Sequence, residues 1–192
     1  LNTGDDSDQV RISADARGNT TDTIAAYGAL NSQIDTGNDN DRLEISATAI
    51  NRDGYAEAVG LDSSTASTGS GDDDVRIHAH ADGLSTNAWA MRDSELNTDS
   101  GNDRVDLRAS TRSGEFDPAF GMENSVLNTG DDSDQVRISA DARGNTTDTI
   151  AAYGALNSQI DTGNDNDRLE ISATAINRDG YAEAVGLDSS TA

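Results

Sequence analysis

The sequence predicts an all-β chain that folds as a right-handed parallel β-solenoid of six coils, with one coil per 30–33 residues. Three observations predict this fold. A long repeat contains a shorter one. Every short repeat contains a segment in which apolar and polar residues alternate. A turn rich in Gly, Asn and Asp precedes each such segment. Fixed repeats in this size range are typical of solenoids, in which each coil packs only on its neighbours.

The repeats define the coils. Residues 1–66 are identical to residues 127–192, so the long period is 126 residues. Within it, segments 2–16, 35–49, 67–81 and 97–111 align without gaps. We therefore expect one continuous solenoid over 1–192, and a fragment of a longer array. Its coils are expected at 2–34, 35–66, 67–96, 97–127, 128–160 and 161–192.

The first block of each coil is predicted to be a strand. In the first coil Val10, Ile12, Ala14 and Ala16 alternate with polar residues, a period of two that directs one face inward and the other outward. The outward column then reads Arg11, Glu44, Arg76, Asp106, Arg137 and Glu170. Opposite charges on adjacent strands stabilise a pair by ~0.2–1 kcal/mol, which favours parallel stacking in register.

The second block of each coil is also expected to be extended, with a break near residues 31–32. It aligns without gaps at 26–34, 58–66, 88–96 and 119–127, and the length variation lies in the connector between the blocks. We expect one ladder of Ile34, Ala66, Leu96 and Leu127, and another of Tyr27, Val59, Trp89 and Phe120. Two orientations remain open, because Ala26 and Gly28 could point inward and leave the aromatic side chains outside.

The composition requires something besides a hydrophobic core. Leu, Ile, Val and Phe supply only 31 of 192 residues, and the net charge is −23 with no lysine. Such a chain is expected to stay disordered unless other interactions offset its conformational entropy. The charge indicates multivalent cations and argues against nucleic acid as a partner. There is no cysteine, and no apolar run approaches the ~20 residues of a membrane span.

One residue is constant in the turn before every strand: Asp8, Asp41, Asp73, Asp103, Asp134 and Asp167. Stacking in register would place these carboxylates about 4.8 Å apart, where two charges repel by ~3–4 kcal/mol at an effective dielectric of 20. Calcium suits such hard oxygen ligands in a flexible geometry. Further acids stand beside the column and are candidate ligands: Asp6, Asp39, Asp132 and Asp165. The alternative is that Asp, Asn and Gly here only form turns.

These turn-plus-strand segments resemble the RTX, or haemolysin-type, calcium-binding repeats of very large bacterial surface proteins of the cyanobacterial type. The nonapeptide pattern is G-G-x-G-x-D-x-U-x, and residues 68–76 match it at Gly69, Gly71, Asp73 and Val75, with Thr68 in place of the first Gly. The resemblance covers about nine residues per coil. It implies a β-roll or β-helix, calcium between stacked turns held by the constant Asp and by turn carbonyls, and secretion before folding. Because the return side lacks the motif, we expect one calcium column.

No cluster of unique polar residues indicates catalysis, so we do not expect an enzyme. The column of Ser32, Ser64, Ser94 and Ser125 lacks a companion base and favours stacked hydroxyl ladders or turn hydrogen bonds. His78 and His80 are expected on the outward face as surface residues. The function expected is a calcium-stabilised structural repeat protein at the cell surface or outside the cell, which forms a filament, sheath, surface coat or stalk. Its partners would be calcium ions and further copies, through self-association or head-to-tail continuation. The alternative is an adhesin or ligand-binding region of a giant RTX surface protein that uses the variable loops.

Overall fold

The computed structural model describes residues 1–113 and 115–192, and this part of the chain is a parallel β-solenoid of about six turns with no helix. Each coil contributes to three ladders. The first contains β1 (Gln9–Gly18), the first halves of β4 (Arg42–Asp62) and β6 (Asp74–Arg92), β8 (Arg104–Ser113), β11 (Gln135–Gly144) and β14 (Arg168–Asn177).

The second ladder returns along the other side of the coil. It contains β2 (Ile24–Leu30), the second halves of β4 and β6, β9 (Asp117–Glu123), β12 (Ile150–Leu156) and β15 (Ala182–Asp188). The third ladder closes the coil with three-residue strands: β3 (Gln33–Asp35), β5 (Thr65–Ser67), β7 (Glu95–Asn97), β10 (Val126–Asn128) and β13 (Gln159–Asp161).

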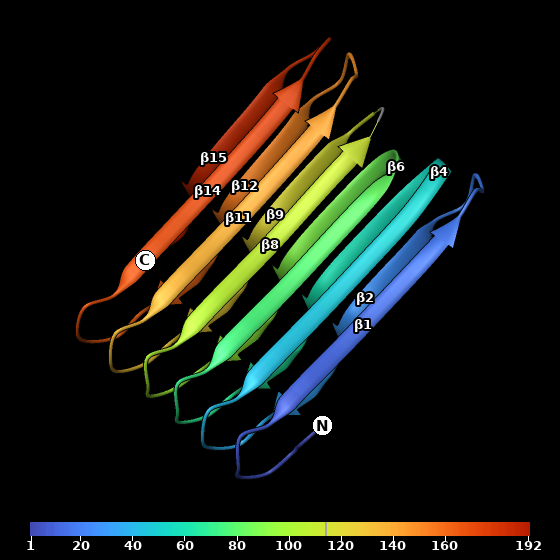
Figure 1. The fold of residues 1–192 in the computed structure, drawn as a ribbon. Helices are drawn as coiled ribbons and strands as arrows, with labels where there is room; N and C mark the ends of the chain where they lie inside the picture. The colour runs from blue at the N-terminus through green and yellow to red at the C-terminus, as the bar shows by residue number, and fades with distance from the viewer. Residues whose placement is uncertain (114) are drawn as a thin grey trace.

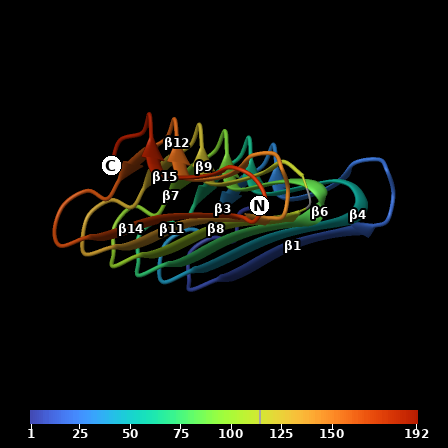
Figure 2. The same cartoon turned by 90° about the horizontal axis from the view of Figure 1, so that it is seen from above.

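All strand pairs are parallel, and the register confirms the gapless alignment of the repeats. The first strand position pairs along the stack as Gln9, Arg42, Asp74, Arg104, Gln135 and Arg168. In Figure 1 the near strands run one way and the far strands return behind them as the stack advances from β1 to β14, which makes the coil right-handed. Figure 2 shows β1, β8, β11 and β14 in one layer and β9, β12 and β15 in the other.

The core between the two layers divides into two parts. Near the Gly-rich turns it contains large aliphatic side chains, including Leu43, Ile77 and Met91, which are fully buried. Near the connectors it contains almost only alanine, with Ala49, Ala81 and others from both layers. The predicted ladder of Ile34, Ala66, Leu96 and Leu127 is confirmed, and Ile160 extends it. Small side chains therefore fill the connector end of the coil.

The aromatic column stacks as expected, but on the outer side of the second ladder. Gly28 points inward, because a Cβ there would meet Ile45 of the opposite layer at 2.4 Å. The rings of Trp89, Phe120 and Tyr153 stack with centroids 5.3–5.4 Å apart, and their planes are nearly parallel. Arg92 covers Trp89 at 4.6 Å from the ring centroid. Of the two orientations that the sequence left open, the second is correct.

A serine ladder stabilises the bend between the second and third strands. A residue with positive φ, such as Asn31, Ser63 or Asp93, begins each bend. The next residue is the constant serine, whose hydroxyl oxygen accepts the backbone N–H of the equivalent serine one coil earlier at 2.9–3.2 Å. Of the two arrangements predicted for these hydroxyls, the structure shows turn hydrogen bonds to the backbone, repeated from coil to coil. Each coil thus satisfies a backbone donor of the coil before it.

The outward charge column lies in register as predicted, from Arg11 to Glu170. Along this charge column, Arg11 Nη2 and Glu44 Oε1 lie within ion-pair distance, at 3.8 Å. Of the eight arginines with ion pairs in the described residues, six instead pair two residues away on their own strand, as in Arg76–Asp74 at 2.9 Å and Arg108–Asp106 at 2.7 Å. In the described residues, no helix is long and apolar enough to cross a membrane.

Candidate metal site

Glycine in the turns is required by the stacking itself. Gly37, Gly69 and Gly163 have φ between +70° and +98°, a region that disfavours other residues. A Cβ on any of them would also lie 1.7–1.8 Å from the carbonyl oxygen of the equivalent glycine one coil earlier. The close approach of one turn to the next therefore explains these glycines without any ligand. It does not explain the constant aspartate that follows them.

The constant aspartates form a buried column along the stack. Asp41, Asp73, Asp103 and Asp134 are 1–3% exposed, and they end the turn just before the first strand begins. In each coil Oδ1 accepts the backbone N–H of the equivalent aspartate one coil earlier, at 2.7–3.0 Å from Asp41 to Asp167. This hydrogen bond uses one carboxylate oxygen and locks the register of neighbouring turns.

The second carboxylate oxygen has no partner. Oδ2 is buried without a hydrogen bond in Asp8, Asp41, Asp73, Asp103 and Asp134. Buried polar atoms are nearly always satisfied in native proteins, and an unsatisfied carboxylate oxygen is costly. A row of such atoms at one corner of the coil indicates that a positive group belongs there.

Threonine hydroxyls lie beside these oxygens. Thr36, Thr68 and Thr129 are 0% exposed, and their Oγ1 atoms make no hydrogen bond of good geometry. Burial raises the pKa of the Asp73 carboxyl, and Thr68 lies close enough to it to offset part of that rise. Thr98 and Thr129 do the same for the next two aspartates. The unsatisfied Oγ1 of Thr68 and Oδ2 of Asp73, which belong to the same coil, therefore lie in one small polar region.

Burial dominates the electrostatics of the column. Removal from water raises the pKa of Asp73 to about 6 and that of Asp103 to about 7, against the smaller effects of the threonine hydroxyl and the backbone N–H. The pKa of Asp134 is also raised, again mainly by burial. Neighbouring carboxylates of the column raise these values further. Without a counter-ion, the column opposes its own ionisation near neutral pH.

The other predicted ligands lie elsewhere on the turn. Asp6, Asp39, Asp132 and Asp165 are exposed and have φ of +75° to +90°. In the third and fourth coils the equivalent positions are Gly71 and Gly101, and these glycines also have positive φ. The structure does not bring them into the buried column, and their assignment as ligands stays a prediction. Over residues 1–113 and 115–192, no three Asp, Glu or His side chains gather into one group.

These threonines are not among the ligands that we predicted from the sequence. The signal was present, because Thr3, Thr36, Thr68 and Thr98 stand five residues before each constant aspartate.

His78 and His80 lie on the outer face as expected, and His80 Nδ1 is 2.8 Å from Ser110 Oγ.

The donor set fits calcium. Carboxylate and hydroxyl oxygens are hard ligands, and calcium accepts six to eight of them in flexible geometry. Magnesium demands a tighter octahedron, and transition metals favour imidazole or thiolate.

No protein-family model, no curated protein and no solved structure matches this chain.

Proposed function

We propose that this chain is part of a calcium-stabilised structural repeat protein that acts outside the cell or on its surface, as a filament, sheath, surface coat or stalk, and that it is not an enzyme. The observation that carries the proposal is the row of buried carboxylate oxygens without partners, which occurs in five of the six coils of an otherwise regular stack. The identity of residues 1–66 and 127–192 supports it further, because an extended array needs no unique unit.

The residues that would hold calcium are Asp8, Asp41, Asp73, Asp103, Asp134 and Asp167, with the threonine hydroxyls beside them. A bound calcium ion would supply the positive charge that the buried column lacks. The aspartates themselves perform two tasks. Oδ1 holds the preceding coil through its backbone N–H, and Oδ2 remains free for a ligand. Loss of the counter-ion would therefore act directly on the groups that set the register.

Chelation tests the proposal. Circular dichroism should show a β-rich spectrum with calcium and loss of that spectrum in EDTA, with recovery on calcium addition. Trp89 is the only tryptophan and is 7% exposed, so its emission should shift to longer wavelength in the same transition. Affinity is expected in the range of extracellular modules, ~0.1–1 mM. A chain that keeps its β-spectrum and its buried tryptophan in EDTA, and that binds no calcium by calorimetry, contradicts the proposal.

One observation favours a second candidate, a ligand-binding region. The connectors carry large exposed hydrophobic side chains: Leu84, Phe116 and Tyr181 are 42%, 49% and 64% exposed. Such residues at loop tips are suited to contact a ligand. Glycan-array binding of the folded chain, compared with a variant in which Phe116 and Tyr181 are replaced by Ser, would test this function. Equal signals for the two chains would rule out the connectors as the binding surface.

A further inference from the structure

Charge is strongly segregated on this molecule. We call the outer side of the first ladder the arginine face; it comprises every second residue of β1, β8, β11, β14 and the first halves of β4 and β6. Ten of the 13 arginines lie there: Arg11, Arg17, Arg42, Arg76, Arg104, Arg108, Arg112, Arg137, Arg143 and Arg168. The same face carries seven acids: Asp15, Glu44, Asp74, Asp82, Asp106, Asp141 and Glu170. Ten positive minus seven negative charges leave a net +3, on a chain whose net charge is −23.

The opposite character belongs to the Gly-rich turns. The turn edge comprises residues 2–8, 35–41, 67–73, 97–103, 128–134 and 161–167, which contain 16 aspartates and no basic residue. The constant aspartates of this set are turned into the coil. The exposed ones face solvent: Asp5, Asp6, Asp39, Asp72, Asp99, Asp131, Asp132, Asp161 and Asp165. The chain therefore presents one strongly acidic edge beside one face of mixed charge with an excess of arginine.

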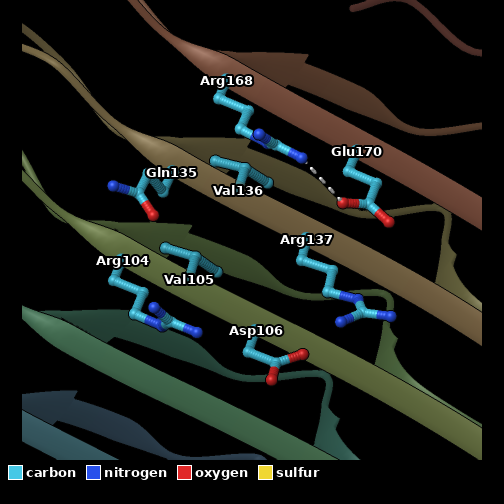
Figure 3. Close-up of a pocket in the computed structure, with 8 residues that line it drawn as sticks. All are labelled: Arg104, Val105, Asp106, Gln135, Val136, Arg137, Arg168 and Glu170. Carbon is cyan, nitrogen blue, oxygen red and sulfur yellow. Dashed lines mark ion pairs between the residues drawn. The ribbon is translucent and has the colours of Figure 1, made fainter.

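A groove on the arginine face contains guanidinium groups without carboxylate partners. It crosses β8, β11 and β14, has a volume of about 200 Å³, and is lined by Arg104, Gln135, Arg137 and Arg168 with two acids (Figure 3). Asp106 is already bound to Arg108 at 2.7 Å, and Glu170 lies 3.6 Å from Arg168. No carboxylate of the described residues lies within 4 Å of the guanidinium nitrogens of Arg104 or Arg137.

We infer that the arginine face is a lateral docking surface for the turn edge of a second copy of this chain. Arginine binds carboxylates through two parallel hydrogen bonds, and the groove offers two unpaired guanidinium groups for this. The partner is identified by its repeat as well as its charge. Every coil has at least one arginine on this face and at least one exposed aspartate on its turn edge, and successive coils are about 4.8 Å apart. Two copies with parallel axes therefore stay in step along their whole length, which an irregular polyanion does not.

This contact also explains how an array could grow sideways. The face and the edge are different surfaces, so the contact is heterologous and leaves each copy with one free face and one free edge. Repetition then produces a sheet or bundle of solenoids. The inference rests on the proposed array function, for which it names the lateral contact. The contact itself does not use the buried aspartate column, although it requires the folded stack.

Sedimentation velocity of the full chain tests the inference, at a fixed calcium concentration and over a range of protein concentrations. The wild-type chain should associate at low ionic strength and dissociate at high ionic strength, because exposed pairs are screened by salt. The Arg104→Gln/Arg137→Gln variant should associate about tenfold more weakly, since two bidentate sites are lost. The matched control is Arg52→Gln/Arg178→Gln, which removes the same charge from exposed connector positions outside the face and should associate like the wild type.

Three results would overturn the inference: a wild-type chain that is monomeric at both ionic strengths, association of the Arg104→Gln/Arg137→Gln variant that is as strong as that of the wild type, or equal weakening in the control. Circular dichroism of the same samples, with and without EDTA, reports separately on the proposed function. A chain that folds with calcium but never associates contradicts only the docking surface. A chain that associates through Arg104 and Arg137 but folds in EDTA contradicts only the calcium proposal.

Discussion

At the scale of single residues, the constant aspartate has two distinct oxygens. Oδ1 of Asp73 accepts the N–H of Asp41 at 2.8 Å, a structural contact that needs no charge. Oδ2 of Asp73 is buried without a hydrogen bond, and this unsatisfied oxygen is the main reason to propose a metal ion here. A substitution that keeps the first oxygen and removes only the charge can therefore separate the two roles.

Asp73→Asn is that substitution. In EDTA we expect the variant to be more stable than the wild type, by on the order of 1 kcal/mol, because a buried uncompensated charge is lost while the Asp41 hydrogen bond remains. Addition of calcium should stabilise the variant less than it stabilises the wild type. A calcium titration that starts in EDTA, followed by circular dichroism, measures both effects. Asp72→Asn, at the neighbouring exposed position, is the control and should keep the full calcium-dependent gain. An equal calcium-dependent gain in the Asp73→Asn variant and in the wild type would contradict a metal role for Asp73.

The raised pKa values also predict how the metal-free chain responds to pH. Burial raises the pKa of Asp73 to about 6 and of Asp103 to about 7, whereas an unfolded aspartate titrates near ~3.9. Between these values the folded state binds more protons than the unfolded state, so stability falls as pH rises from about 4 to about 7. In chelator, the folded fraction, followed by circular dichroism and by Trp89 emission, should be higher at pH 5 than at pH 8. Asp103→Asn should reduce that difference, and an unchanged difference would show that this carboxyl is not responsible.

At the scale of the element, each coil is held by corners in which side chains satisfy the backbone of the preceding coil. The serine ladder does this at the bend, and the aspartate column does it at the turn. Both corners require residues with positive φ beside them, including Ser63 and Gly69. The strands supply the regular pairing, while the corners determine which atoms of neighbouring coils meet.

Two turn glycines allow the effect of stacking to be measured apart from backbone strain. Gly4 and Gly69 both have positive φ, +93° and +76°, but a Cβ at Gly4 meets no atom within 4 Å, whereas at Gly69 it would lie 1.8 Å from Gly37 O. Gly4→Ala should cost about 1 kcal/mol from strain alone. Gly69→Ala should cost about 4 kcal/mol or more, because a coil must shift. Urea denaturation compares the two variants, and equal losses would mean that coil contact adds nothing to the requirement for glycine.

At the scale of the whole molecule, every coil contacts only its neighbours, and the first-ladder strands pair through the same columns at each step. Stability in such a stack is close to a sum over coils and their interfaces. The excess negative charge is concentrated on the turn edge, so it acts along the full length of the stack.

Removal of one whole coil should therefore be tolerated. Deletion of residues 67–96 is expected to leave a five-coil solenoid with a β-rich spectrum in calcium, because β4 can pair with β8 through the same columns. Its stability should be lower than that of the parent chain, since an interface is lost and Glu44 would then face Asp106. Deletion of residues 67–81 removes only half a coil and should abolish the fold, because the second and third ladders lose their register. Circular dichroism and sedimentation compare the two chains, and equal folding of both would contradict coil-by-coil stacking.

Much of the fold follows from the sequence alone. Gapless repeats admit one register, so the coil length, the strand alternation at Val10 and Ile12, the charge column from Arg11 to Glu170 and the aspartate column could all be predicted. These features depend only on which residues are neighbours along the stack, and a fixed period specifies that directly.

Only the tertiary structure decided where side chains point in the second block and in the turns of each coil. The outward position of Trp89 depends on Gly28 and its equivalents facing the opposite layer, which alternation does not reveal because the second block is interrupted by a bend. The free Oδ2 of Asp73, the hydroxyl of Thr68 beside it and the unpaired Arg137 on the outer face are likewise absent from the pattern. The physical reason is that periodicity specifies contacts between equivalent residues of successive coils, whereas contacts between different positions of one coil depend on its turns, whose positive φ angles set the direction of each side chain.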